Sequence, residues 1–269
     1  MIISILGCGW YGKALATTLT GDGHLVKGSV ISAEKLAALT ELGIAPFLVN
    51  FKADSESYDA EFFACDVLVI CITPRTRHGE GGDYLPKIKR IIDAASLHIV
   101  QKVIYISSTA VYGESCTEVT ESDIPIPDTE SGKILLKAEN LFCAQSALKT
   151  TVIRFGGLVG PGRHPGRFFA GKKDVPNGQA PVNLIHLDDC IGINQAIINQ
   201  NKFGLTINGV TPHHPQKMAF YTRATEQTGL DAPQFIDELK AWKVIDSSIL
   251  SAKLNYRFRV ANWDDCIFT

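Results

Sequence analysis

MIISILGCGWYG, residues 1–12, is the stretch of sequence that decides the fold of this chain. Its first six residues form a short apolar run rich in β-branched side chains, which is long enough for one buried strand. Three glycines follow with G-x-G-x-x-G spacing at Gly7, Gly9 and Gly12, and residues 13–20 then carry a helical pattern. Because strand, glycine turn and helix come in this order, the stretch predicts a dinucleotide-binding βα unit.

Each glycine of this turn has its own expected task. Gly7 lets the chain turn sharply, Gly9 leaves no side chain between the backbone and a pyrophosphate, and Gly12 lets the helix pack closely on the strand. The N-terminus of the helix, where Trp10 and Tyr11 lie, offers backbone N–H groups and a positive dipole end to phosphates. We therefore predict that these five residues bind the cofactor. The alternative is a tight βα turn that binds no ligand.

The composition is that of an ordinary globular protein. The chain has 269 residues, of which 45% are hydrophobic and 20% charged, and its net charge is −2. This charge and the lack of a long basic run argue against nucleic acid and anionic membranes as partners. No apolar run is long enough to span a membrane, and no secretory signal pattern precedes the first predicted strand. We therefore expect a cytoplasmic protein.

The thiols and imidazoles predict no metal site. The seven cysteines are odd in number, scattered and without a C-x-x-C pair, which indicates buried thiols in a reducing compartment. Cys8 lies in the glycine turn near a helix N-terminus, where thiolates are stabilised, and we hypothesise that its oxidation blocks cofactor binding. His213 and His214 are adjacent but have no further ligand candidates around them.

Strands and helices alternate over the first 155 residues, which predicts an α/β protein with a doubly wound parallel sheet of the Rossmann type. Ligands of such sheets bind at the carboxyl ends of the strands. We expect a Rossmann domain over residues 1–155 with 187–208 returning to it, and a smaller substrate-side subdomain over 156–184 and 211–269. After the first strand, the predicted strands are residues 25–30, 47–51, 66–73, 102–108 and 151–155, and the predicted helices are 33–42, 83–97 and 131–148.

Two further stretches carry candidate functional residues. Hydroxyl groups end the strand at 102–108 in SSTAVYG, where Ser108 and Tyr112 would face a ligand crevice, unless the hydroxyls only cap the strand end. Downstream, Arg163 and Arg167 lie in a loop rich in glycine and proline, and their guanidinium groups suit a diphosphate or carboxylate. The alternative for both arginines is a solvated loop charge.

Several motifs together resemble the extended and atypical short-chain dehydrogenase/reductases, the NAD-dependent epimerase/dehydratase-like proteins. They are GCGWYG, SSTAVYG, RFGGLVGPGRHPGRF, VNLIHLDD and INGVTPHHP, and in order they extend over nearly the whole chain. The last of them makes the chain most similar to the YeeZ-like subgroup of atypical members. The resemblance implies bound NAD or NADP, and a small polar substrate such as a nucleotide-sugar. It also implies that Ser108 hydrogen-bonds the reacting oxygen.

The chain departs from this family at its catalytic pair. The family uses Tyr-x-x-x-Lys, in which the tyrosine is the general acid/base and the lysine lowers its pKa. Alignment on Glu139 places Ser131 at the tyrosine position and Leu135 at the lysine position, and no tyrosine occurs between residues 114 and 150. Tyr112 is the remaining candidate for a catalytic tyrosine. Two functions stay open: an oxidoreductase or epimerase-like enzyme, or a non-catalytic NAD(P)-binding sensor or regulatory protein.

The type of cofactor and the oligomeric state also stay open. The window where an acid would bind a ribose 2′-OH holds Ser32 but no charge, which leaves NAD and NADP possible, with a slight preference for NADP. Asn50 resembles the family position that contacts adenine, and Thr73 lies where the family chain passes the cofactor ribose. The family forms dimers through the helices expected here at 83–97 and 131–148, so we expect a monomer or a homodimer.

Overall fold

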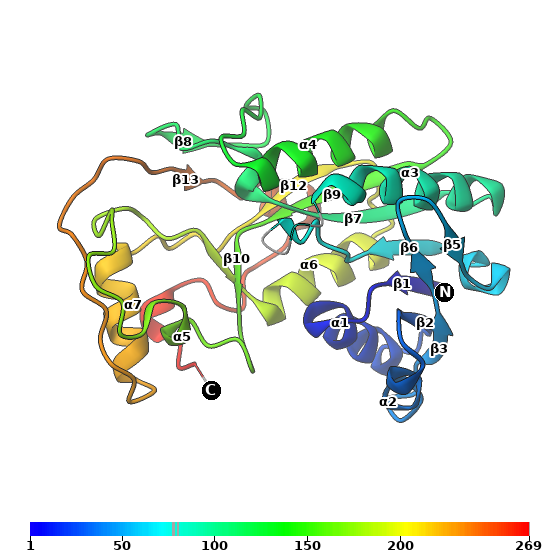
Figure 1. Ribbon diagram of the computed structural model, residues 1–269, viewed down its shortest axis with the longest axis horizontal. Helices are drawn as coiled ribbons and strands as arrows, with labels where there is room; N and C mark the ends of the chain where they lie inside the picture. Colours follow the sequence, from blue (N-terminus) through cyan, green and yellow to red (C-terminus); the bar gives the residue numbers. More distant parts are fainter. Residues whose placement is uncertain (77–78, 80, 269) are drawn as a thin grey trace. The chain divides into compact units, whose positions relative to one another are not determined.

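The computed structural model, which describes residues 1–76, 79 and 81–268, contains a seven-stranded sheet of order β12-β9-β7-β6-β1-β2-β3 (Figure 1). β1 pairs in parallel with β2 on one side and β6 on the other, and the pairs β2–β3 and β6–β7 are parallel too. The chain adds strands outward from β1 in both directions, which confirms the predicted doubly wound sheet and puts its switch point between β1 and β6. The strands of this sheet are β1 (Ile2–Leu6), β2 (Leu25–Val30), β3 (Ala45–Leu48), β6 (Val67–Ile70), β7 (Lys102–Ser108), β9 (Lys149–Phe155) and β12 (Thr206–Gly209).

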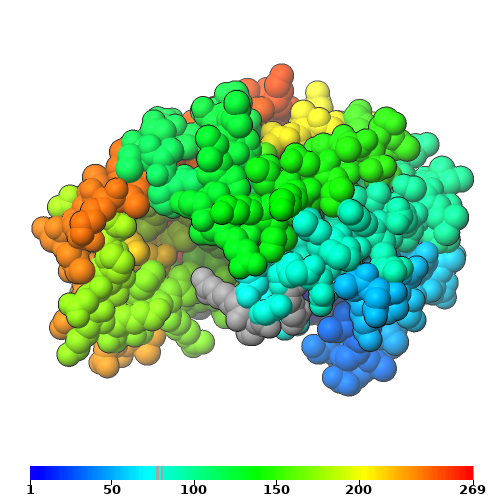
Figure 2. Space-filling view, turned by 45° about the horizontal axis from the view of Figure 1, so that its top comes forward, coloured from blue at the N-terminus to red at the C-terminus, as the bar shows by residue number. Residues whose placement is uncertain are grey.

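Amphipathic helices cover the sheet. α3 and α4 pack against each other and lie side by side in Figures 1 and 2, and Figure 1 shows α1 on the opposite face of the sheet. α1 is a helix because Leu15, Ala16 and Leu19 recur at helical spacing and are buried together. No helix in the described part of the chain has the length and apolar character to cross a membrane. The helices are α1 (Trp10–Gly21), α2 (Leu36–Thr40), α3 (Gly81–Leu97), α4 (Glu130–Cys143), α5 (Gly166–Phe169), α6 (Leu187–Asn199), α7 (Lys217–Glu226) and α8 (Ser248–Leu254), with 3₁₀ turns η1 (Ala33–Lys35), η2 (Ala60–Phe63), η4 (Thr109–Val111) and η5 (Trp263–Asp265).

The chain divides into two compact units. The first consists of residues 1–111, 129–153 and 197–206, and the second of residues 112–128, 154–196 and 207–269. The predicted return segment 187–208 is thus shared between the units, and the domain boundaries stay a prediction. The second unit contains two small parallel sheets, one of β8 (Glu118–Val119) with β13 (Val244–Ile245) and one of β10 (Gly157–Val159) with β11 (Leu184–His186), while β4 (Asn50–Phe51) and β5 (Glu56–Ser57) pair in the first. The core cluster of the second unit is Val159, Val182, Leu184, Phe220, Tyr221, Trp263 and Phe268.

Most element positions agree with the sequence, and the differences lie at helix ends and in two strands. The strand predicted at 47–51 is divided between β3, Ala45–Leu48 of the central sheet, and β4, Asn50–Phe51, which pairs with β5 instead. The strand predicted at 66–73 is the shorter β6, Val67–Ile70. The strands predicted at 25–30 and 102–108 have those bounds. The helix predicted at 33–42 is instead the 3₁₀ turn η1 followed by the short α2, and the helix predicted to reach residue 148 ends with α4 at Cys143. α3 begins at Gly81, so Asp83 lies in its first turn and does not cap it. Helix ends depend on tertiary contacts and capping geometry more than on the periodicity that predicts the helix itself.

One of the two helices expected at a dimer contact, α4, has an apolar stripe of Ile134, Ala138, Leu141 and Phe142 that is partly used within the chain. Ala138 and Phe142 of α4 are fully buried, and the Phe142 ring lies 4.9 Å from the Tyr105 ring of β7. Ile134 and Leu141 are half-buried. The stripe therefore packs on the sheet through these two residues, and whether the protein is a monomer or a homodimer stays open.

Candidate dinucleotide-binding site

The glycine turn joins β1 to α1 and leaves space for a side chain at only one of its three glycines. Gly7 has a φ of +102°, and a Cβ there would lie 3.1 Å from Cγ2 of Ile72. A Cβ on Gly12 would lie 2.2 Å from the carbonyl oxygen of Gly7, so only glycine lets α1 pack this closely on the turn. Around Gly9, in contrast, a Cβ would meet no atom within 4 Å. The open side of the turn is therefore at Gly9.

The N-terminus of α1 begins at this open side. Gly9 is the N-cap residue, and no side chain caps the helix there. The positive end of the helix dipole and the first backbone N–H groups are therefore directed at a potential anion. Trp10 is half-buried and Tyr11 is buried, so Tyr11 contacts a ligand at most through its backbone. The cradle suits a pyrophosphate, because a Cβ at Gly9 would fill the space that the phosphates need.

Ser29 holds the turn in place and is a site residue that the sequence reasoning missed. Its Oγ accepts a 2.9 Å hydrogen bond from the backbone N–H of Gly7, and its carbonyl oxygen accepts one of 2.9 Å from the N–H of Cys8. The Ser29 side chain is fully buried at the end of β2. The signal in the sequence is a small hydroxyl side chain within reach of the turn, and not a charge toward the ribose.

The residues predicted to contact the ribose and adenine follow neighbouring strands of the sheet. Ser32 follows β2, and its Oγ donates a 3.0 Å hydrogen bond to Oε1 of Glu34. Thr73 is exposed just after β6, and Asn50 is half-buried in β4, directly after β3. The carboxyl ends of parallel strands share one edge of the sheet, so these residues and the glycine turn lie along the same edge. Glu34 adds a carboxylate that the sequence window, which ended at Ser32, did not include.

The serines at the end of β7 differ in their partners. Ser107 is buried and donates a 2.5 Å hydrogen bond to Oε1 of Glu139 on α4. Ser108 is half-buried, and its Oγ accepts a 3.2 Å hydrogen bond from the N–H of Ala110. Ser107 therefore ties the strand to the helix, while Ser108 keeps a hydroxyl proton for which the described residues offer no acceptor.

The first turns of α4 hold no phenol and ammonium pair. Ser131 is half-buried, and Leu135 is only 5% exposed, so the lysine position is part of the core. Lys133 and Lys137 are exposed on the other side of the same helix. Thr129 caps α4 by accepting a 3.1 Å hydrogen bond from the N–H of Gly132, which accounts for where the helix begins.

The hydroxyl group of Tyr112 is already engaged inside the second unit. It accepts a 2.6 Å hydrogen bond from Nη1 of Arg154 and lies 3.1 Å from both Oδ1 of Asn208 and the carbonyl oxygen of Thr120. The residue is 2% exposed. Burial raises the pKa of Tyr112, and the Arg154 guanidinium opposes this only in part. A buried phenol with a raised pKa is a poor acid/base at neutral pH, so this geometry favours a structural role.

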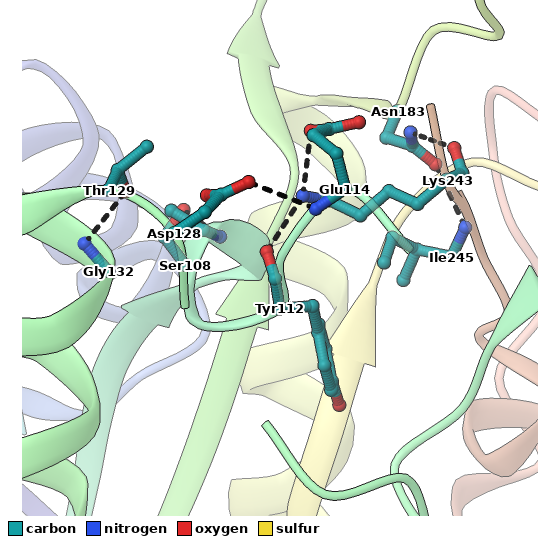
Figure 3. A network of polar contacts seen from close by, with 10 residues as sticks. Ser108, Tyr112, Glu114, Asp128, Thr129, Gly132, Asn183, Lys243 and Ile245 are labelled. Carbon is teal, nitrogen blue, oxygen red and sulfur yellow. Dashed lines mark hydrogen bonds and ion pairs between the residues drawn. The ribbon is translucent and has the colours of Figure 1, made fainter. Parts of the chain in front are cut away.

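A polar network braces the main chain beside Tyr112 (Figure 3). The buried Lys243 donates 2.9 Å and 3.1 Å hydrogen bonds to the carbonyl oxygen of Tyr112 and to Oε1 of Glu114. Asn183 donates to the carbonyl oxygen of Lys243 and accepts from the N–H of Ile245. These contacts join segments 60 or more residues apart in sequence. Nothing in the local pattern around Lys243 predicts them.

The two arginines predicted to bind substrate are both exposed. Nε of Arg163 donates a 2.8 Å hydrogen bond to the carbonyl oxygen of Leu158, and its guanidinium lies 5.9 Å from the Phe168 ring centroid. Arg167 lies in α5. Both belong to the second unit, where a guanidinium facing solvent is accessible to an anionic ligand.

Burial is the main influence on the pKa of the Cys8 thiol. It raises the pKa of the thiol to about 12, and the hydrogen bond with the Ser29 backbone opposes this only in part. The helix N-terminus therefore does not produce a thiolate here, which weakens the oxidation hypothesis. In the described part of the chain, no three histidine, cysteine or acidic side chains gather as a metal site.

Comparison with known proteins agrees with this geometry. Residues 7–184 match a family model described as NAD(P)H-binding. Protein YeeZ of Escherichia coli strain K12 is 36% identical over 264 residues, which cover 96% of this chain and 95% of that protein.

Solved structures share the fold at lower identity. A conserved protein of unknown function from Silicibacter pomeroyi has a TM-score of 0.79 at 22% identity, covering 97% of this chain and 95% of that one. UDP-glucuronic acid 4-epimerase from Bacillus cereus, in complex with NAD, has a TM-score of 0.78 at 19% identity, covering 98% of each chain. The glycine cradle, the doubly wound sheet and the match to YeeZ together show that this chain belongs to the NAD(P)H-binding family and has an epimerase/dehydratase-like short-chain dehydrogenase/reductase fold.

Proposed function

We propose that this protein is an NAD(P)-dependent oxidoreductase or epimerase-like enzyme acting on a small polar substrate of the nucleotide-sugar kind. The observation that carries the proposal is the cradle at Gly9. There a helix N-terminus without a side-chain cap adjoins an open space, which a side chain on residue 9 would otherwise enter. The substrate class is supported by the likeness to a UDP-sugar epimerase, which by itself shows the fold alone.

Ser108 is the group that we propose to act on the substrate. Its Oγ already accepts from Ala110, which leaves the hydroxyl proton to donate to a substrate carbonyl or hydroxyl oxygen. The bonded pair of Ser107 and Glu139 fixes the end of β7 and so orients its neighbour. A bound nicotinamide would supply the hydride chemistry. We further propose that Arg163 and Arg167 bind the anionic part of the substrate.

A second function, a non-catalytic NAD(P)-binding sensor or regulatory protein, is favoured by one observation. The lysine position of the family pair is Leu135, which is buried, and Ser131 replaces the tyrosine. A tyrosine acid/base therefore cannot act from α4. Binding without turnover would leave the glycine cradle intact and Ser108 without a reaction.

The polar residues after β2 bear on the choice between NAD and NADP. The Glu34 carboxylate, hydrogen-bonded to Ser32, suits a ribose 2′-OH and would repel a 2′-phosphate. This favours NAD, in contrast to the slight preference for NADP from the sequence. Measured dissociation constants for NAD and NADP decide between the two cofactors. If the Glu34 carboxylate causes the preference for NAD, Glu34→Gln should bring the two dissociation constants closer together.

Two measurements, made one after the other, test the proposal. A thermal shift with NAD and with NADP tests binding, because ligand at a hundred times Kd adds about 2.7 kcal/mol of stability. Deuterium-labelled NADH or NADPH is then incubated with nucleotide-sugars, and transfer of the label to a substrate supports the enzyme. Binding without transfer supports the sensor, and the absence of a shift with either cofactor overturns both functions.

A further inference from the structure

The second unit contains a cavity of about 520 Å³ that includes none of the predicted site residues. Sites for small molecules commonly measure roughly 300–1,000 Å³. Four segments far apart in sequence line it: the start of β8, the turn at residues 212–214, β13 with the start of α8, and residues 256–261. All of them belong to one unit of the fold, so the cavity is a property of that unit alone.

The walls of this cavity are held by bonds to the surrounding structure. β13 pairs with β8 through Val244 and Ile245. The Tyr256 hydroxyl donates a 2.7 Å hydrogen bond to Oδ1 of Asp189, and Oγ of Ser247 accepts one of 3.0 Å from the N–H of Val210. Among the charged lining residues, Asp246 takes part in the wall, since its Oδ1 accepts a 2.7 Å hydrogen bond from the N–H of Ser248. These bonds fix the wall, so the cavity is preformed.

His214 is part of the lining of this cavity, and one of its ring nitrogens is engaged. Its Nδ1 lies 2.9 Å from the carbonyl oxygen of Val182, and since a carbonyl only accepts, Nδ1 carries the proton. Burial lowers the pKa of His214, although the Val182 bond and the carboxylates of Glu118 and Asp246 oppose this. The lowered pKa favours the neutral ring, in which Nε2 carries a lone pair because the proton is on Nδ1.

Two side chains in the lining, Glu118 and Arg257, carry opposite charges. Glu118 and Arg257 are both exposed, and neither forms an ion pair within the part of the chain that the structure describes. An anionic ligand would meet Glu118 and Asp246, and a simple cation would leave Arg257 unused. A ligand with both an ammonium and a carboxylate group satisfies both charges, and the lining also includes the apolar side chains of Val244 and Phe258, which suit methylene groups.

We infer that this cavity binds a small zwitterion, with its ammonium group at Glu118, Asp246 and Nε2 of His214 and its carboxylate at Arg257. The site lies outside the residues proposed for the dinucleotide and for its substrate, so it would serve a second ligand. The matching charges select the ligand class, since removing either charge from the ligand leaves one protein charge without a partner.

The test is binding of 6-aminohexanoate to the full chain, measured by calorimetry or ligand-observed NMR. Hexylamine and hexanoate are the matched probes, because each keeps the carbon chain and lacks one charge. Each should bind about fivefold or more weakly, which is the effect of about 1 kcal/mol for one exposed ion pair. ω-Amino acids with shorter and longer chains then measure the spacing of the two protein charges, and a single best length is expected.

Two charge-removing variants identify the site. In Glu118→Gln, 6-aminohexanoate should bind no better than hexanoate, and in Arg257→Gln no better than hexylamine. Glu226→Gln and Lys173→Gln remove exposed charges outside the lining and should change nothing. Equal binding of the three probes, binding that both lining variants leave unchanged, or no binding of any ω-amino acid overturns the inference. Dinucleotide affinity is measured in parallel and should be the same in all four variants.

Discussion

The glycine turn after β1 and the first turns of α4 lie in the same unit, and they differ in how much of the family pattern they keep. At the turn, every glycine has a geometric reason: a positive φ at Gly7, an open face at Gly9 and a close approach at Gly12. On α4, Ser131 and the buried Leu135 lie where the alignment on Glu139 predicts the phenol and the ammonium group. We therefore propose that this chain keeps the part of the family pattern that binds the cofactor and departs from it in the part that transfers a proton.

The largest expected effect is at Gly12. In Gly12→Ala the new Cβ lies 2.2 Å from the Gly7 oxygen, so α1 must move away from the turn. We expect a loss of about 3 kcal/mol in the free energy of unfolding, at the upper end for overpacked sites, together with loss of dinucleotide binding. Denaturant unfolding and cofactor titration measure the two effects.

The control for this variant lies in the same helix. A Cβ on Gly21, the last residue of α1, meets no atom within 4 Å. Gly21→Ala should therefore leave cofactor binding unchanged and the stability equal or slightly higher. If Gly12→Ala binds dinucleotide as the native chain does, the turn is not the site.

Leu135→Lys tests the first turns of α4, at the position aligned with the family lysine. Residue 135 is 5% exposed, and an ammonium group placed there loses its hydration, so we expect a loss of about 3 kcal/mol in the free energy of unfolding. Asn140→Lys, at an exposed position of the same helix, should cost less than about 0.5 kcal/mol. A Leu135→Lys chain as stable as the native one would mean that α4 can still accommodate the family lysine.

Gly9→Ala should separate binding from stability. A methyl group here contacts no protein atom, so the free energy of unfolding should change by less than about 0.5 kcal/mol. The same methyl group occupies space needed by the pyrophosphate, and dinucleotide affinity should fall by about tenfold or more, or about 1.4 kcal/mol. Equal losses of stability and affinity would contradict the open geometry of the cradle.

Ser29→Ala is expected to have a smaller effect on both quantities. It leaves the buried N–H of Gly7 without its 2.9 Å partner, which costs about 1–2 kcal/mol of stability, and the looser turn should weaken dinucleotide binding severalfold. Ser4→Ala is the matched control, because it removes a buried hydroxyl that donates to the carbonyl oxygen of Phe62. Ser4→Ala should lower stability to a similar extent and leave affinity unchanged.

The bond between Gly7 and Ser29 also shows what the sequence could and could not predict. The doubly wound sheet and the glycine cradle follow from short-range patterns, apolar runs and glycine spacing, and both were predicted. The bond from Gly7 to Ser29 spans 22 residues and that from Lys243 to Tyr112 spans 131, so they depend on which strands become neighbours. The engaged hydroxyl of Tyr112 was missed for the same reason, since Arg154 and Asn208 reach it from two other strands.

The smallest expected effect is a pH dependence of the free energy of unfolding that dinucleotide affinity does not share. Burial lowers the pKa of His214 and of His164, so the unfolded chain binds more protons below the ordinary histidine value near 6.5. Stability should therefore fall as the pH drops from about 6.5 toward the lower folded-state values, and His214→Asn should flatten this dependence. The proposed binding uses backbone N–H groups, and the Cys8 thiol beside the cradle, with its pKa raised to about 12, stays protonated. Dinucleotide affinity should thus be constant between about pH 6 and 8. A parallel loss of affinity and stability over this range would mean that a titrating group helps to hold the cofactor.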